Sequence, residues 1–128
     1  MSHETMLATR LQEFVAAWNA RDVRRLLTFF HPNGSFHGPV GPDPLGVSAH
    51  GHEAIRDALA AIFKLLPDGT LVPILLFFSG NRALSEWYYE FSGADGKPTR
   101  TYGCDVYEFA GYLIQSKNAY IKQYAPRI

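Results

Sequence analysis

The order of the expected elements predicts an α+β fold, with three N-terminal helices packed on one face of a strongly curved, mostly antiparallel sheet. Apolar residues recur at helical spacing in the first half of the chain, and from about residue 71 they alternate with period two. Helices first and consecutive strands last is typical of this class. The 128 residues show no repeat, linker or low-complexity tract, so we expect a single domain over 1–128.

Three segments have the spacing of amphipathic helices. The first covers residues 5–20, with its apolar face at Leu7, Leu11, Phe14, Val15 and Trp18. Asp22 can cap a second, short helix that ends before His31-Pro32, because a residue preceding proline avoids helical geometry. The third begins near Gly51, with a buried side at Ile55, Leu59, Ile62, Phe63 and Leu66.

The remaining segments are expected to be strands and loops. Asn33-Gly34 predicts a turn before a short strand at 35–37, and 38–46 is too rich in Gly and Pro for regular structure. Strands are expected over 71–79, 82–92, 99–109 and 112–124. In 82–92 the alternation puts Trp87, Tyr89 and Phe91 on one face, and Glu86, Tyr88 and Glu90 on the other.

The composition excludes several classes of partner and site. Twelve basic and twelve acidic residues give a formal net charge of zero, so neither nucleic acid nor an anionic membrane is an expected partner. The single cysteine, Cys104, excludes an internal disulfide and a multi-cysteine zinc site. No signal peptide or membrane-spanning run is visible, so we expect a cytoplasmic protein.

Four strings, in order, resemble the NTF2-like (cone-fold) superfamily. Residues 14–22 resemble its first-helix signature and residues 51–56 the start of its third helix. Residues 104–109 resemble the penultimate strand of SnoaL-like cyclases and steroid Δ-isomerases, and 39–44 resembles the isomerases' Pro-Val-Gly loop. The resemblance runs from about Leu11 to Tyr120. It implies a cone with a largely apolar cavity, and a homodimer through the outer sheet face.

The isomerase machinery carries over only in part. Asp105 stands where the resemblance implies an aspartate that stays protonated and donates a hydrogen bond to a forming oxyanion. Phe14 replaces the family's second oxyanion donor, a tyrosine, and Gly38 replaces its general-base aspartate. Steroid isomerisation by that mechanism is therefore not expected.

Asp105 is the leading catalytic candidate, because alternation places it among inward-facing aromatic residues. Loss of water there favours the neutral carboxyl, which can exchange a proton near neutral pH. The alternative is a structural, hydrogen-bonded carboxylate. His37 lies beside the vacant base position and is the candidate substitute, with a plain loop histidine as the alternative and Asp43 as a weaker substitute.

No metal site or cofactor is expected. His50 and His52, with His31 and His37 nearby, lack a regular ligand spacing. Seven aromatic side chains are candidates for a ligand-binding wall or for the core: Phe14, Trp18, Trp87, Tyr89, Phe91, Tyr107 and Tyr120.

Two function classes follow. The first is a protein that binds a small apolar molecule, in its enzymatic form a cofactor-free isomerase, cyclase or dehydratase that uses Asp105. The second is a non-catalytic dimer of the same fold that binds a ligand or another protein.

Overall fold

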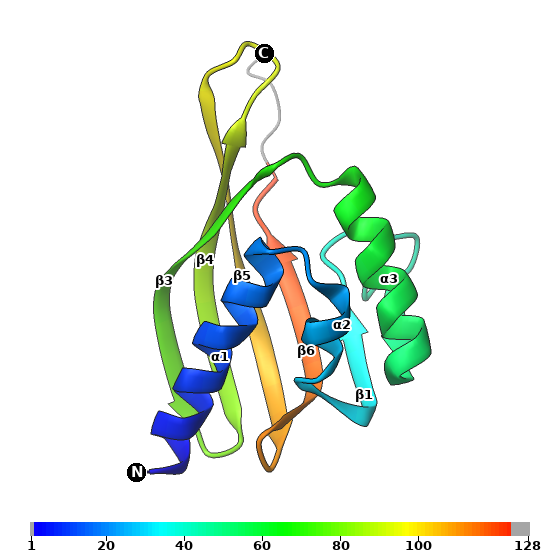
Figure 1. The fold of residues 1–128 in the computed structure, drawn as a ribbon, viewed down its shortest axis with the longest axis vertical. Helices are drawn as coiled ribbons and strands as arrows, with labels where there is room; N and C mark the ends of the chain where they lie inside the picture. Colours follow the sequence, from blue (N-terminus) through cyan, green and yellow to red (C-terminus); the bar gives the residue numbers. More distant parts are fainter. Residues whose placement is uncertain (1, 124–128) are drawn as a thin grey trace.

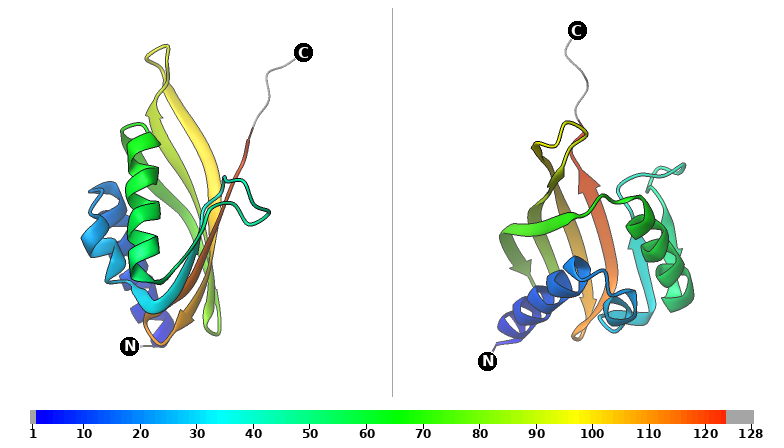
Figure 2. Two further views of the ribbon diagram at one scale, coloured as in Figure 1. Left: turned by 90° about the vertical axis from the view of Figure 1, so that its right-hand side faces the viewer. Right: turned by 45° about the horizontal axis from the view of Figure 1, so that its top comes forward.

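The computed structural model describes residues 2–123 and confirms the expected fold (Figure 1). Its helices are α1 (His3–Asn19), α2 (Val23–Leu27) and α3 (Gly51–Leu65). Its strands are β1 (Phe30–His37), β2 (Ser48–His50), β3 (Gly69–Ser79), β4 (Arg82–Ser92), β5 (Pro98–Ala110) and β6 (Leu113–Ile121). All three helices lie on the same face of one curved sheet (Figure 2).

The six strands run in the order β2-β1-β6-β5-β4-β3. Neighbouring strands are antiparallel except β1 and β6, which pair in parallel. β3 to β6 form a meander, and β1 joins it from the other end of the chain. The strands that carry the candidate residues, β4, β5 and β6, are thus adjacent.

All three predicted helices are present, although Leu66 lies just beyond the end of α3 and is half-buried, not on its buried side. The local causes of the helices are visible. The Ser2 hydroxyl accepts a hydrogen bond from the backbone N–H of Thr5 at the start of α1, at 3.1 Å. The Asp22 carboxylate accepts one from Arg25 N–H at the start of α2, at 3.0 Å. The predicted inner side of α3 faces the core at Ile55 and Leu59, both fully buried.

The region before α3 differs from the prediction. β1 begins at Phe30 and is therefore longer than the expected strand at 35–37. Asn33-Gly34 does not form a turn before the strand but lies within it. The pairing of β1 with β6 is irregular there, because its register shifts between Phe30 and Ser35. A short strand, Ser48–His50, was not expected at all. At the other end, β6 stops at Ile121, and the predicted limit at Tyr124 lies outside the described residues.

The core fills one end of the space between helices and sheet. The ring of Phe14 packs edge-on against Phe29, Phe30 and Tyr107, at centroid distances of 5.5, 6.0 and 6.4 Å. Beyond Phe14 the space between α1, α3 and the sheet is left open as a cavity.

No helix among residues 2–123 is long and apolar enough to span a membrane.

Candidate functional site

A cavity of about 610 Å³ lies between the helices and the concave face of the sheet. That volume is within the range of small-molecule sites. Its walls are almost entirely apolar and come from α1, α3, the connection between α3 and β3, the end of β1, the β1–β2 loop and the strands β3 to β6. The cavity is therefore suited to a compact apolar molecule.

Six of the seven aromatic candidates line this cavity. They are Phe14, Trp18, Trp87, Tyr89, Phe91 and Tyr107. The prediction for Tyr120 is wrong, because this side chain lies on the other face of the sheet. It is 54% exposed, pairs with Cys104 across β5 and β6, and its hydroxyl oxygen accepts a hydrogen bond from Asn118.

The polar centre of the cavity wall is an ion pair between Asp105 on β5 and Lys117 on β6. Lys117 Nζ lies 3.1 Å from Asp105 Oδ1, and each residue is only 4% exposed. The rings of Trp18 and Phe36 flank the ammonium at 5.3 and 5.1 Å. Lys117 is the functional candidate that the sequence reasoning missed.

Asp105 accepts three hydrogen bonds from the protein. Oδ1 accepts from Lys117, whereas Oδ2 accepts from Trp87 Nε1 at 3.0 Å and from the Tyr107 hydroxyl at 3.4 Å. The sequence expectation of a neutral carboxyl considered burial among aromatic rings alone. The structure adds a compensating cation, which is itself one of the three donors, so the Asp105 side chain is arranged to accept hydrogen bonds from the protein.

Burial also acts on Tyr107, whose side chain lies beside Asp105. Loss of water raises the pKa of its hydroxyl well above the usual value, and the nearby Asp105 carboxylate raises it further. A neutral Tyr107 keeps its proton to donate to Asp105 Oδ2. It therefore belongs to the scaffold of the ion pair.

Trp87 reaches Asp105 because the residue opposite it on β5 has no side chain. Trp87 pairs with Gly103 across β4 and β5. A Cβ at Gly103 would lie 2.6 Å from the indole ring and 2.5 Å from the backbone oxygen of Tyr120. The indole therefore lies over Gly103, with its N–H directed at Asp105.

His37 is not brought to the ion pair. Its Nδ1 lies 2.7 Å from the Ser48 hydroxyl, and its ring is 6.1 Å from that of His50. Its neighbours Phe36 and Gly38 line the cavity, so alternation turns His37 away from it. Partial burial, helped by the nearby His50, lowers the pKa of His37. The structure thus gives no support to His37 as a substitute for the general base that is missing at Gly38.

The positions that differ from steroid isomerases both lie at the cavity. Phe14 stands at the position of the family's tyrosine donor and Gly38 at that of its general base, and both residues line the cavity as the resemblance implies. A Cβ at Gly38 would meet no atom closer than 3.7 Å, so the structure has room for a side chain at the position where the base is absent.

Asp43, the weaker substitute for the base, is exposed in the β1–β2 loop and does not line the cavity. Within residues 2–123, no three metal-ligating side chains come together.

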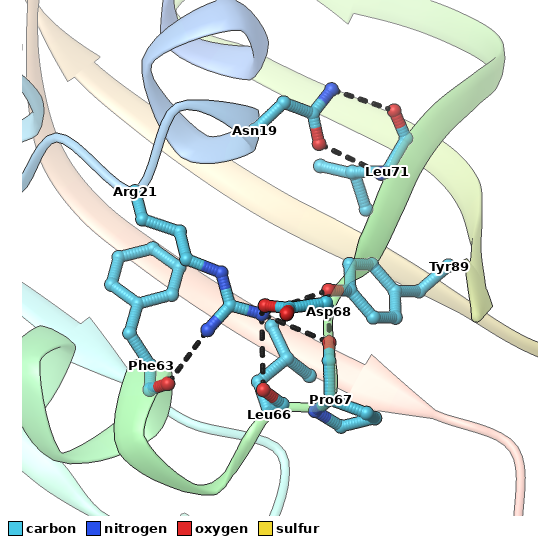
Figure 3. Close-up of polar contacts among 8 residues, drawn as sticks. All are labelled: Asn19, Arg21, Phe63, Leu66, Pro67, Asp68, Leu71 and Tyr89. Atoms are coloured by element: carbon cyan, nitrogen blue, oxygen red, sulfur yellow. Dashed lines mark hydrogen bonds and ion pairs between the residues drawn. The ribbon is translucent and has the colours of Figure 1, made fainter. Parts of the chain in front are cut away.

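A second cation, Arg21, joins the end of α1 to the end of α3 behind the wall of the cavity (Figure 3). It follows α1 with a left-handed backbone, φ 54°, and its guanidinium extends to the end of α3. There it donates to the backbone oxygens of Phe63, Leu66 and Pro67, at 2.7, 3.0 and 2.9 Å. These bonds fix the connection between α3 and β3.

Two further contacts complete this corner (Figure 3). The Tyr89 hydroxyl donates to the Pro67 oxygen and accepts from Arg21, so this cavity-lining ring has its polar end engaged. The Asn19 side chain both donates to and accepts from the backbone of Leu71, at 3.1 and 2.8 Å. The end of α1 is thereby joined to β3.

Comparison with known proteins agrees with this architecture. The model of the SnoaL-like domain family matches residues 11–116. A search of curated protein sequences finds no match. Among solved structures, a putative isomerase from Bacillus subtilis superposes with a TM-score of 0.77 at 18% identity, over 95% of this chain and 90% of that one.

Two other solved structures share the fold at low identity. TerC, co-crystallised with polyporic acid, superposes with a TM-score of 0.75 at 18% identity, covering 91% of this chain and 92% of its own. SalBIII is an epoxide hydrolase/cyclase-like enzyme in pyran ring formation in the polyether salinomycin. It superposes with a TM-score of 0.75 at 18% identity, covering 93% of this chain and 92% of its own. These solved structures show the shared fold. The family match over residues 11–116 shows that the chain belongs to the SnoaL-like domain family.

Proposed function

We propose that the chain binds a compact, mainly apolar molecule in the cavity and promotes a cofactor-free proton transfer there, of the isomerase, cyclase or dehydratase type. The observation that carries this proposal is the buried Lys117–Asp105 pair in an otherwise apolar wall. A few convergent polar groups in a large apolar cavity are typical of small-molecule sites. The cyclase-like and isomerase-like structures that share the fold support it.

Asp105 is the proposed proton acceptor. Oδ2 is engaged by two protein donors, whereas Oδ1 accepts from Lys117 alone and keeps a lone pair for a ligand proton. The proton returns to another atom of the same ligand, so the reaction needs no oxidant or reductant. The steroid-isomerase mechanism itself is not proposed, because Phe14 and Gly38 lack its donor and base.

The test uses 2-tetralone, an apolar bicyclic ketone, and follows exchange of its α-hydrogens in D₂O by NMR. The wild type is expected to accelerate this exchange, and Asp105→Asn to reduce the acceleration by roughly 10²–10⁴-fold while it keeps its circular dichroism spectrum. Equal exchange by the wild type and the folded variant would overturn the role of Asp105. If the wild type does not accelerate the exchange, the proposed catalysis is wrong and the non-catalytic alternative stands.

An exposed apolar surface favours the second candidate, a non-catalytic protein-interaction dimer that is formed through the outer sheet face. Outward side chains of the sheet include Phe77 on β3, Tyr102 on β5 and Tyr120 on β6, at 59, 42 and 54% exposed. Patches of this kind mark interaction sites. Sedimentation should show a dimer that Phe77→Glu dissociates; a wild-type monomer at high concentration would contradict it.

A further inference from the structure

The Lys117 ammonium has fewer acceptors than it has protons. An ammonium carries three N–H donors. Among residues 2–123, Asp105 is the one hydrogen-bond acceptor of Nζ, at 3.1 Å. The rings of Trp18 and Phe36 attract the positive charge but supply no oxygen or nitrogen acceptor. Nζ therefore keeps donor capacity at the cavity wall.

The other strong donors of the wall are already engaged. Trp87 Nε1 and the Tyr107 hydroxyl donate to Asp105, and the Tyr89 hydroxyl donates to the Pro67 oxygen. The hydroxyls of Ser85 and Thr101 also line the cavity, but a neutral hydroxyl is a weaker donor than an ammonium. A ligand oxygen that enters the cavity thus finds its strongest partner in Lys117.

The charge of Asp105 decides which kind of oxygen is accepted. The pair is neutral as it stands, and both residues are almost completely buried. A ligand carboxylate would bring a second negative charge into an apolar cavity with no cation left to balance it, which is strongly unfavourable. An uncharged carbonyl accepts the hydrogen bond and leaves the charge balance unchanged.

We propose that Lys117 is the ligand-anchoring residue of the cavity and donates to the oxygen of an uncharged apolar carbonyl compound, while Asp105 makes the site reject carboxylates. This inference rests on the proposed function, because it requires that the cavity takes up an apolar molecule. It adds the chemical class of the ligand and names the residue that selects it.

Three naphthalenes of similar shape separate the possibilities: 2-ethylnaphthalene, 2-acetylnaphthalene and 2-naphthoate. Their dissociation constants are measured by calorimetry at pH 7.5. The wild type is expected to bind the ketone at least tenfold more tightly than either of the others. In Asp105→Asn, which keeps the shape of the side chain, the uncompensated Lys117 should tighten 2-naphthoate at least tenfold and change the ketone less than threefold.

The matched control is the double variant Asp105→Asn with Lys117→Met, which removes both charges and avoids leaving an unpaired buried carboxylate. It should bind the ketone and the hydrocarbon equally. The infrared carbonyl band of bound 2-acetylnaphthalene should lie lower in the wild type than in this double variant, because Lys117 donates to that oxygen only in the wild type.

The outcomes distinguish this inference from the proposed function. Equal binding of the ketone and the hydrocarbon by the wild type would overturn the role of Lys117 while apolar binding stands. Unchanged 2-naphthoate binding in folded Asp105→Asn would overturn the role of Asp105. Binding of none of the three compounds would remove the proposed function itself.

Discussion

Lys117 lines the cavity and Arg21 contacts residues of its wall from behind, and the surroundings of these two cations differ. The Arg21 guanidinium donates to three backbone oxygens and to the Tyr89 hydroxyl, and lies 3.5 Å from Asp68. Lys117 has a single acceptor, Asp105. Arg21 is also partly exposed, with 28% of its side chain accessible, whereas Lys117 is buried.

The difference separates a structural cation from one that is available to a ligand. The planar fork of an arginine can satisfy several carbonyls of one helix end at once, and here it does so. A lysine ammonium in an apolar wall with one acceptor retains hydrogen-bonding capacity that nothing in residues 2–123 uses. The number of acceptors, and not burial or charge alone, therefore tells the two roles apart.

The largest effect is expected from Lys117→Met, which leaves the buried Asp105 carboxylate without its cation. Removal of one partner of a buried pair destabilises a protein by about 3–5 kcal/mol. Urea unfolding of the variant measures this loss, with the Asp105→Asn/Lys117→Met double variant as the control. The double variant should recover most of the stability, because it carries no unpaired charge. A single variant as stable as the wild type would show that the pair is not buried as described.

Arg21→Met is expected to come second. It removes the donor shared by the oxygens of Phe63, Leu66 and Pro67. A hydrogen bond to a charged group contributes about 1.5–3 kcal/mol, and water can replace part of it at this partly exposed corner, so we expect a loss of about 2 kcal/mol. Urea unfolding measures it, with Arg21→Lys as an intermediate case.

The assignment of Arg21 as a structural cation would be wrong if Arg21→Met changed which ligand the cavity prefers. The variant's preference between 2-acetylnaphthalene and 2-naphthoate should match that of the wild type, because Arg21 does not line the cavity. A change in that preference as large as the one expected for Asp105→Asn would assign Arg21 to the binding site.

Tyr107→Phe should have a smaller effect, and one that depends on pH. It removes a 3.4 Å hydrogen bond to Asp105, so we expect a loss of about 1 kcal/mol at pH 7. The raised pKa means that the folded state holds the Tyr107 proton more tightly than the unfolded chain. This contribution is complete below the unfolded pKa of about 10 and is lost as pH rises through the folded pKa.

The measurement is urea unfolding of the wild type and Tyr107→Phe between pH 7 and pH 11. The wild type should lose more stability than the variant above pH 10. Parallel loss in both proteins would mean that Tyr107 ionises in the folded state as readily as an exposed tyrosine.

Asp68→Asn should have the smallest effect. Asp68 is fully exposed and lies 3.5 Å from Arg21, and exposed ion pairs contribute little. The urea midpoint is expected to be unchanged. A clear decrease would shift the importance of the Arg21 contacts from the backbone oxygens to the ion pair.

Much of the fold and part of the site could be predicted from local pattern. Alternation along β4 and β5 placed Trp87, Tyr89 and Asp105 on the inner face, because side chains of a regular strand point to opposite faces in turn. The capping residue Asp22 and the apolar face of α3 likewise depend on neighbours within a few positions.

A single irregularity explains the two errors on β6. Near the β5–β6 turn Phe109 pairs with Ile114, but the register then shifts, so that Glu108 pairs with Ser116. Without this bulge Tyr120 would lie opposite Gly103 on the inner face, and Lys117 would point outward. One extra residue in a strand reverses the face of every residue that follows. Local alternation carries no signal for it.

Gly103 couples the wall of the cavity to the pairing of two strands. Any larger residue there must displace the Trp87 indole, which both lines the cavity and donates to Asp105. The same residue would press on the backbone oxygen of Tyr120 in β6. A substitution at position 103 would thus disturb the cavity wall, the orientation of its carboxylate and the pairing of β5 with β6 together.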